Sequence, residues 1–234
     1  MKFPNPFSTL SKFEWALWIG SLVVITVSFL IGANSGLLIL IASLIGATAL
    51  IFVSKGNVFG QVLTVVFSLL YAVISLEFRY FGEMITYLGM TSPIAVLSII
   101  EWLKHPYESG KAEVEVSKLD RRKTIWMIIL AVVVTAIFYF ILKAFHTTNL
   151  IISTVSVTTS FLASYLMLFR SPTYALAYAA NDVVLIILWV LASIESISYL
   201  PMVICFLVFL MNDSYGFYNW TRIRRRQVLS KVEM

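Results

Sequence analysis

Residues 173–220 read TYALAYAANDVVLIILWVLASIESISYLPMVICFLVFLMNDSYGFYNW, two apolar runs that each hold an Asn-Asp pair, Asn181-Asp182 and Asn212-Asp213. Each run is long enough to cross a bilayer as a helix. An acidic side chain at the centre of a membrane helix costs roughly 2.5–3.5 kcal/mol on insertion scales, and lipid cannot satisfy the neighbouring amide. We therefore expect both pairs to face the protein interior or a water-filled cavity, where they mark a site.

The composition of the whole chain agrees with a membrane protein. Sixty per cent of the 234 residues are hydrophobic and 12% are charged, against about 25% charged in a soluble domain. The predicted fold class is all-α, a polytopic membrane protein. The single cysteine, Cys205, allows neither an intrachain disulfide nor a cysteine metal site. With no catalytic or metal-binding motif in the sequence, we expect no cofactor, no metal and no enzyme activity.

Hydropathy predicts about eight transmembrane helices, the first of them retained rather than cleaved as a signal peptide. Eight spans place both termini on one side of the membrane. With both termini in the cytoplasm, all but Arg79 and Lys143 of the 17 Lys and Arg residues are cytoplasmic, as the positive-inside rule requires. The basic run at 222–226 then reads as an anchor beside anionic lipid rather than a nucleic-acid site. The predicted spans are 13–32, 36–54, 58–77, 80–103, 124–145, 149–168, 173–195 and 198–220.

An internal repeat appears when the chain is compared with itself at an offset of 118 residues. Residues 65–102 then match 183–220 without gaps, with Glu77 opposite Glu195 and Trp102 opposite Trp220. Spans four apart run in the same direction, so the repeat is parallel, an arrangement found in transporters. The predicted core is 3+1+3 helices plus one N-terminal helix. The domains are an N-terminal segment and extra helix (1–35), a first bundle (36–103), a cytoplasmic loop and linker helix (104–148), a second bundle (149–221) and a basic cytoplasmic tail (222–234).

The candidate site combines the Asn-Asp pairs with aromatic residues. Helical spacing puts Tyr178, Asp182 and Trp189 on one face of their span, and Asp213 lies at a similar depth in the next. Carboxylates and ring faces both attract a flat, positively charged heterocycle, and the amides could bind a carboxamide or ribose hydroxyls. The alternative is that each Asp only bonds a neighbouring helix. The predicted substrate-binding residues are Tyr178, Asn181, Asp182, Trp189, Asn212, Asp213 and Tyr215, with Gln61 and Tyr71 from the first bundle.

The segments SPTYALAYAANDVVLIILWVLA (171–192), FLVFLMNDSYGFYNW (206–220) and the closing basic run resemble the PnuC family of nicotinamide riboside transporters. The stretch GNVFGQ…YFGEM…EW is similar to the same family's first bundle, so the resemblance covers about residues 36–226. It implies a 3+1+3 core related to the SWEET sugar transporters and a homotrimer in the bacterial cytoplasmic membrane. It also implies uptake of a vitamin precursor by facilitated diffusion, with trapping by a cytoplasmic ribosylnicotinamide kinase.

Several alternatives stay open at this point. Relatives of the family carry thiamine or riboflavin, and the sequence does not exclude those ligands. Buried Asp182 and Asp213 could also titrate and couple transport to an ion gradient. A receptor or structural protein would need no polar site at the middle of the membrane.

Overall fold

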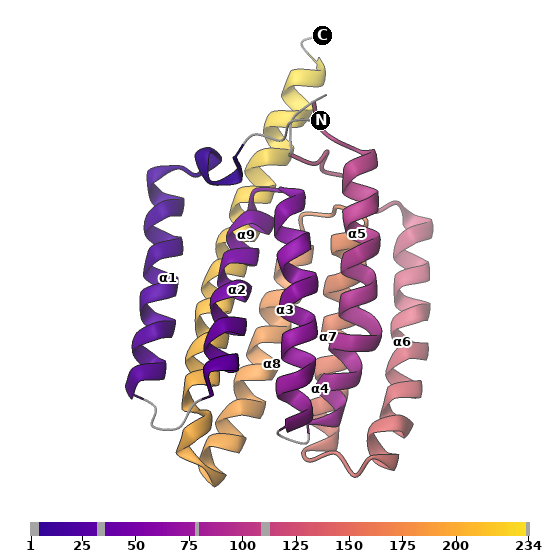
Figure 1. Ribbon diagram of the computed structural model, residues 1–234. Coiled ribbons are helices and arrows are strands. Elements are labelled where there is room, and N and C mark those ends of the chain that lie inside the picture. The colour runs from indigo at the N-terminus through magenta and orange to yellow at the C-terminus, as the bar shows by residue number, and fades with distance from the viewer. Residues whose placement is uncertain (1–4, 32–35, 78–79, 109–112, 233–234) are drawn as a thin grey trace.

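The computed structural model describes residues 5–31, 36–77, 80–108 and 113–232, which are nearly all helical (Figure 1). Eight helical segments of this part are long and apolar enough to span a membrane, which confirms the number of spans. Their bounds lie within three residues of the predicted ones except at the C-terminus. Arg79 lies outside the described residues. The crossings are α1 (Lys12–Ile31), α2 (Leu37–Ser54), α3 (Val58–Glu77), α4 with α5 (Phe81–Thr86 and Ser92–Lys104), α6 (Arg121–Ala144), α7 (Leu150–Leu168), α8 (Tyr174–Glu195) and α9 (Leu200–Val232).

Six of the crossings form a closed ring. Packing runs in the order α2, α3, α5, α7, α8 and α9, and α9 returns to α2. The other two crossings lie outside the ring, with α1 against α2 and α9, and α6 against α7. In Figure 1 these two helices stand at opposite edges of the molecule, and both ends of the chain lie at the same end of the bundle. We call this end the termini end and the other the far end.

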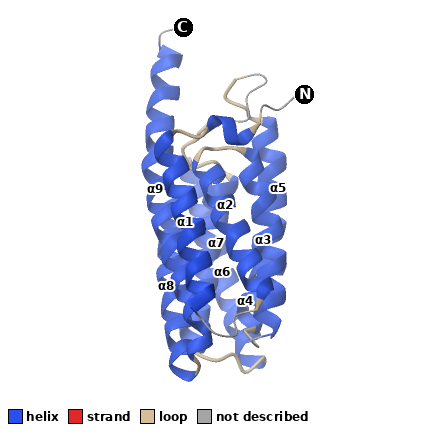
Figure 2. Cartoon of the chain, turned by 60° about the vertical axis from the view of Figure 1, so that its left-hand side comes forward, coloured by secondary structure: helices blue, strands red, loops and turns tan. Residues whose placement is uncertain are grey.

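The ring consists of two halves of three crossings. One half contains α2, α3 and the α4–α5 crossing, and the other contains α7, α8 and α9, while α6 connects them. The 3+1+3 architecture with one additional N-terminal helix is therefore confirmed. Figure 2, turned by 60°, shows α6 and α7 behind α1 and α2, as expected for helices on opposite sides of one bundle.

The fourth crossing is interrupted by a π-helical turn, Tyr87–Thr91, between α4 and α5. Pro93, the second residue of α5, has no N–H to donate to the carbonyl one turn back, so the regular α-helical hydrogen bonding is interrupted here. Wider turns of this kind shift the phase of the side chains and occur often at functional sites. Here Tyr87 and Thr91 are both buried.

Helix α9 extends well past the ring at the termini end (Figure 1). Its 33 residues correspond to about 50 Å at 1.5 Å per residue, compared with a hydrocarbon core of about 30 Å. The sequence predicted that this span would end at 220, and the structure corrects that, since the basic run continues the same helix. A helix can continue there because charged side chains in its last turns are solvated beyond the lipid.

The loop between α5 and α6 fastens the termini end of the ring. Val114 donates its N–H to the Gly56 carbonyl at 2.9 Å, and Gln227 of α9 donates from Nε2 to the Val114 carbonyl at 3.1 Å. Glu115 pairs with Lys231, whose ammonium group lowers the pKa of that carboxyl. The loop thus bonds both the α2–α3 turn of the first half and the last helix of the second.

The turn between α2 and α3 depends on two glycines. Gly56 has a φ of +64°, a left-handed conformation that favours glycine. Gly60, in the first turn of α3, packs directly against the end of α2, where a Cβ would lie 2.5 Å from the Val53 backbone nitrogen. Backbone cannot move aside as a side chain can, so this contact fixes the distance between the two helices.

We expect Gly60→Ala to lower the free energy of unfolding by about 1–3 kcal/mol, the usual cost of overpacking. Thermal unfolding of the detergent-purified protein measures this. The matched control is Gly20→Ala in α1, where a Cβ meets nothing within 4 Å and alanine is the better helix former. Equal melting temperatures for the two variants would contradict the close approach.

Candidate functional site

A small cavity of about 50 Å³ lies at the centre of the ring. It receives side chains from both halves, including both aspartates of the Asn-Asp pairs and aromatic rings from α3, α9 and the π-helical turn. The lining residues are Gly46, Ala49, Leu50, Val53, Thr64, Phe67, Tyr87, Thr91, Met167, Tyr178, Asn181, Asp182, Phe206, Phe209 and Asp213.

Asp182 and Asp213 meet in this cavity. Each lies the same number of residues from the far end of its helix, at Glu195 of α8 and Leu200 of α9, which corresponds to about 20 Å. Each is 3% exposed, and their carboxyl groups are within hydrogen-bonding range of each other. The Asp182 Oδ2 atom has no hydrogen-bond partner among the described residues. Because buried polar atoms are nearly always paired, a carboxyl oxygen that no protein group donates to, in a residue that lines a cavity, indicates a place for a ligand.

Helix α7 orients the other polar residues of α8. The Asn181 Oδ1 atom accepts hydrogen bonds from Thr159 Oγ1 at 2.8 Å and Ser160 Oγ at 3.0 Å. Both lone pairs of that oxygen are then used, so Asn181 can offer a ligand only N–H donors. One turn closer to the termini end, the Tyr178 hydroxyl lies 3.3 Å from Ser164 Oγ. These bonds hold two of the predicted residues against the cavity wall.

The first half contributes residues that the sequence did not single out. Thr64 occupies the position equivalent to Asp182 in the repeat, and both line the cavity. Tyr87 and Thr91 reach the cavity from the π-helical turn. The signal that could have found them is Pro93, which predicts an irregular turn at this depth. The site is therefore asymmetric, since the acids come only from the second half.

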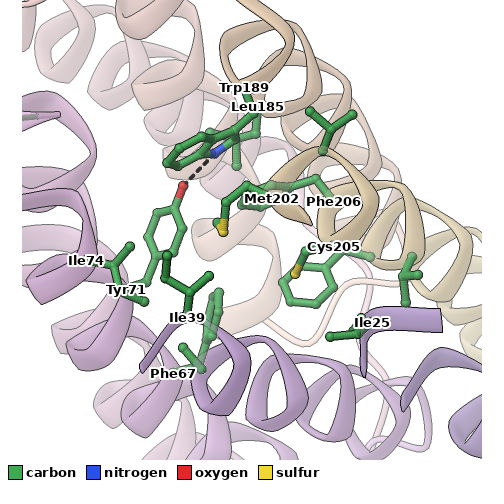
Figure 3. Packing of buried hydrophobic residues seen from close by; sticks show 14 of the residues in the cluster. Ile25, Ile39, Phe67, Tyr71, Ile74, Leu185, Trp189, Met202, Cys205 and Phe206 are labelled. Atoms are coloured by element: carbon green, nitrogen blue, oxygen red, sulfur yellow. Dashed lines mark hydrogen bonds between the residues drawn. The ribbon is translucent and has the colours of Figure 1, made fainter. Parts of the chain in front are cut away.

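Tyr71 and Trp189 lie outside the cavity wall, toward the far end. They are equivalent positions of the repeat, 118 residues apart, and the Trp189 Nε1–H donates to the Tyr71 hydroxyl at 3.1 Å. Figure 3 shows this bond within the apolar cluster that also contains Phe67 and Phe206. The Tyr71 ring lies 4.3 Å from the Tyr87 ring. The structure thus brings the predicted residues Tyr71 and Trp189 together. They separate the cavity from the far end of the bundle and do not line the cavity wall. We call this pair the far-end closure.

A second pair of equivalent aromatic residues lies toward the termini end. The Trp102 and Trp220 rings are 5.5 Å apart. The Trp102 Nε1–H donates to the Met167 carbonyl at 3.2 Å, and the Trp220 Nε1–H donates to the Val53 carbonyl at 2.8 Å. Each tryptophan thus bonds the first helix of the opposite half. Val53 and Met167 also line the cavity, so this pair closes it on the termini side.

Three further predicted residues do not line the cavity. Asn212 donates from Nδ2 to Ser21 Oγ of α1 at 3.0 Å, and the Tyr215 hydroxyl donates to Glu14 Oε1 of α1 at 2.8 Å. Both therefore face the extra helix. Gln61 is buried on α3, and its Nε2 atom has no partner among the described residues. A role for these three in ligand binding stays a prediction.

The chemistry of the cavity favours a cation. Its lining includes two carboxyl groups and four aromatic rings of Phe67, Tyr87, Phe206 and Phe209, with the Tyr178 ring as a fifth, and no Lys, Arg or His among the described residues. Carboxylates and ring faces both attract positive charge. The volume of about 50 Å³ holds one or two water molecules at about 30 Å³ each, whereas pockets for small organic ligands are about 300 Å³ or larger. The structure therefore represents a closed state, and a larger ligand requires the two halves to separate.

Comparisons with known proteins identify relatives across most of the chain. The family described as nicotinamide mononucleotide transporter matches residues 36–222. The nicotinamide riboside transporter PnuC of Neisseria mucosa is 26% identical over 190 residues, which cover 80% of this chain and 72% of that protein. The nicotinamide riboside transporter PnuC of Haemophilus influenzae is 22% identical over 211 residues, 90% of each chain. A crystal structure of the vitamin B3 transporter PnuC superposes with a TM-score of 0.81 at 26% identity, covering 94% of this chain and 95% of that one.

We expect Asp182→Asn to raise the melting temperature of the ligand-free protein by about 2–4 °C, the shift that 1 kcal/mol gives at this chain length. The amide Nδ2 can donate to Asp213, and one of two adjacent buried acids is removed. Thermal unfolding in detergent measures the effect. Glu195→Gln, an exposed acid at the end of the same helix, is the control and should not change the melting temperature. A lower melting temperature for Asp182→Asn would contradict an unsatisfied acid pair.

Proposed function

The chain belongs to the nicotinamide mononucleotide transporter family, and we propose that it carries nicotinamide riboside, a precursor of NAD, across the membrane. The observation that carries the proposal is the charge of the central cavity. Asp182 and Asp213 are paired there, and the described lining residues include no basic side chain. Nicotinamide riboside is a pyridinium cation with an uncharged ribose, so its charge complements this site.

The same charge argument separates the riboside from its phosphorylated form. A phosphate monoester adds about −1.5 to −2 charges at pH 7, which would be placed among carboxyl groups with no cation to balance it. Desolvating an unpaired charge is costly in a buried site. The family description names the mononucleotide and the relatives name the riboside; we propose the riboside for this chain.

Each residue of the cavity has a distinct proposed role. Asp182 and Asp213 face the positive ring, and Tyr178 and Tyr87 offer their ring faces to it. Asn181 donates N–H groups to the carboxamide oxygen or a ribose hydroxyl, since its own oxygen is already bonded to α7. Trp189 and Tyr71 form the far-end closure, which separates the bound ligand from the far end of the bundle. Gln61, Asn212 and Tyr215 remain candidates for contact in a state with a wider cavity.

The proposed transport mechanism is a movement of the two halves of the ring relative to each other. We propose that the bundles, residues 36–103 and 149–221, rock about the cavity so that the two aromatic closures open in turn. The segments 1–35, 104–148 and 222–234 form the remaining predicted domains. The positive-inside rule supports a cytoplasmic termini end in a bacterial cytoplasmic membrane. A homotrimer, facilitated diffusion and trapping by a cytoplasmic kinase complete the proposal, which assigns the chain no catalytic activity.

We expect calorimetry of the purified protein to show binding of nicotinamide riboside and much weaker binding of nicotinamide mononucleotide, thiamine and riboflavin. Asp182→Asn and Asp213→Asn should each weaken riboside binding about tenfold or more, since each removes one of the two acidic side chains that face the cation. Glu195→Gln is the control and keeps the affinity. Tighter binding of the mononucleotide, or of another vitamin, would overturn the assignment.

An ion-coupled mechanism remains a second candidate because a pair of adjacent acids could carry a proton with the substrate. We expect uptake into liposomes to reach the same initial rate with and without an imposed proton or sodium gradient, as facilitated diffusion requires. The control variant is Glu77→Gln, which removes an exposed acid at the far end of α3 and leaves the acids of the cavity unchanged. Strict dependence on either gradient would replace facilitated diffusion with coupled transport.

A further inference from the structure

One buried acid has no role in the central cavity. Glu83 on α4 is 3% exposed. Its Oε1 atom accepts a hydrogen bond from Ser156 Oγ of α7 at 2.9 Å, whereas its Oε2 atom has no partner among the described residues. The ion pairs of the described residues do not include Glu83.

An ionised Glu83 is not a fully satisfied structural residue. An ionised carboxyl needs donors at both oxygens, and a protonated one needs an acceptor for its O–H group. Among the described residues, no donor reaches Oε2. A side chain used only for packing would cost less if it were apolar. The free oxygen therefore indicates a group that is bound only part of the time.

Glu83 lies one helical turn from a residue of the cavity wall. Glu83 and Tyr87 are four residues apart, which places them on one face of the crossing with a rise of about 6 Å. Tyr87 lines the cavity and lies within electrostatic range of both Glu83 and Asp182. Tyr71, part of the far-end closure, is also close enough to interact with the Glu83 charge. The carboxyl thus lies beside the closure, one helical turn from the site.

Helix α7 connects Glu83 with the cavity wall through hydrogen bonds. Ser156 bonds Glu83, and the next turn of α7 carries Thr159 and Ser160, which bond Asn181 of the cavity wall. Hydroxyl groups on successive turns of α7 therefore bond first Glu83 and then Asn181 of the cavity wall. The Tyr71 and Tyr87 rings lie 4.3 Å apart, so aromatic surface connects the far-end closure with the cavity wall.

We propose that Glu83 is a second anionic subsite, which takes the positively charged ring of a pyridinium ligand between the far-end opening and the Asp182–Asp213 site. The inference rests on the proposed function. Opening of the Tyr71–Trp189 closure exposes the Glu83 carboxyl to the incoming ligand, and the cation supplies the partner that Oε2 lacks. The subsite selects for charge, since an uncharged ligand of the same shape gains nothing from it.

The test compares nicotinamide riboside with its reduced 1,4-dihydro form, which keeps the ribose and carboxamide but carries no positive charge. Initial uptake rates of both are measured in liposomes for the wild type, Glu83→Gln, Glu83→Asp and the exposed control Glu77→Gln. Because both substrates are measured on one preparation, the ratio of their kcat/KM values is independent of the folded fraction.

For Glu83→Gln we expect the ratio of charged to uncharged substrate to fall about tenfold through the KM of the charged form, since one ion pair is lost. The Glu83→Asp variant keeps the charge and should restore most of the ratio, and Glu77→Gln should keep it entirely. A wild-type ratio in Glu83→Gln, or equal losses for both substrates, would overturn the subsite and leave the proposed function standing. Failure of the wild type to take up the riboside would overturn the proposed function and the subsite with it.

Discussion

The two carboxyl groups of Asp182 and Asp213 impose the constraint on which the rest of the structure depends. They lie deep in a membrane-spanning bundle, where lipid offers no hydrogen bonds and an exposed acid is costly. A ring of six crossings excludes lipid from them on all sides, and aromatic pairs close the ring above and below. Each pair joins the two halves through hydrogen bonds, Tyr71 with Trp189 and the indoles of Trp102 and Trp220 with opposite backbone carbonyls.

The repeat explains why the closures are symmetric while the site is not. Tyr71 with Trp189, and Trp102 with Trp220, are equivalent positions that meet, so each half contributes one residue to each closure. In the cavity, Thr64 stands opposite Asp182, and the acids come only from the second half. With both acids in the second half, that half can stay bound to the ligand while the first half moves. This arrangement suits a carrier with a single central site.

Much of this was predictable from the sequence, because hydropathy and helical phase are local properties. They placed the eight spans, and they put Tyr178, Asn181, Asp182 and Asp213 together at one depth. What they could not give was which face of a helix meets which neighbour. Asn212 and Tyr215 turn toward α1, a helix outside the repeat, and bond Ser21 and Glu14 there.

The remaining surprises come from one irregular crossing. Tyr87 and Thr91 reach the cavity because a π-helical turn before Pro93 changes the phase of the side chains, a change that a regular helical repeat cannot anticipate. Glu83, which the sequence did not single out, lies in the same crossing one turn before Tyr87 and is buried. The single most direct measurement is a structure of the protein with nicotinamide riboside bound. It should place the pyridinium ring within about 6 Å of the Tyr178 or Tyr87 ring and beside the carboxyl groups of Asp182 and Asp213. A ligand found between α1 and α9, against Asn212 and Tyr215, would contradict the central claim.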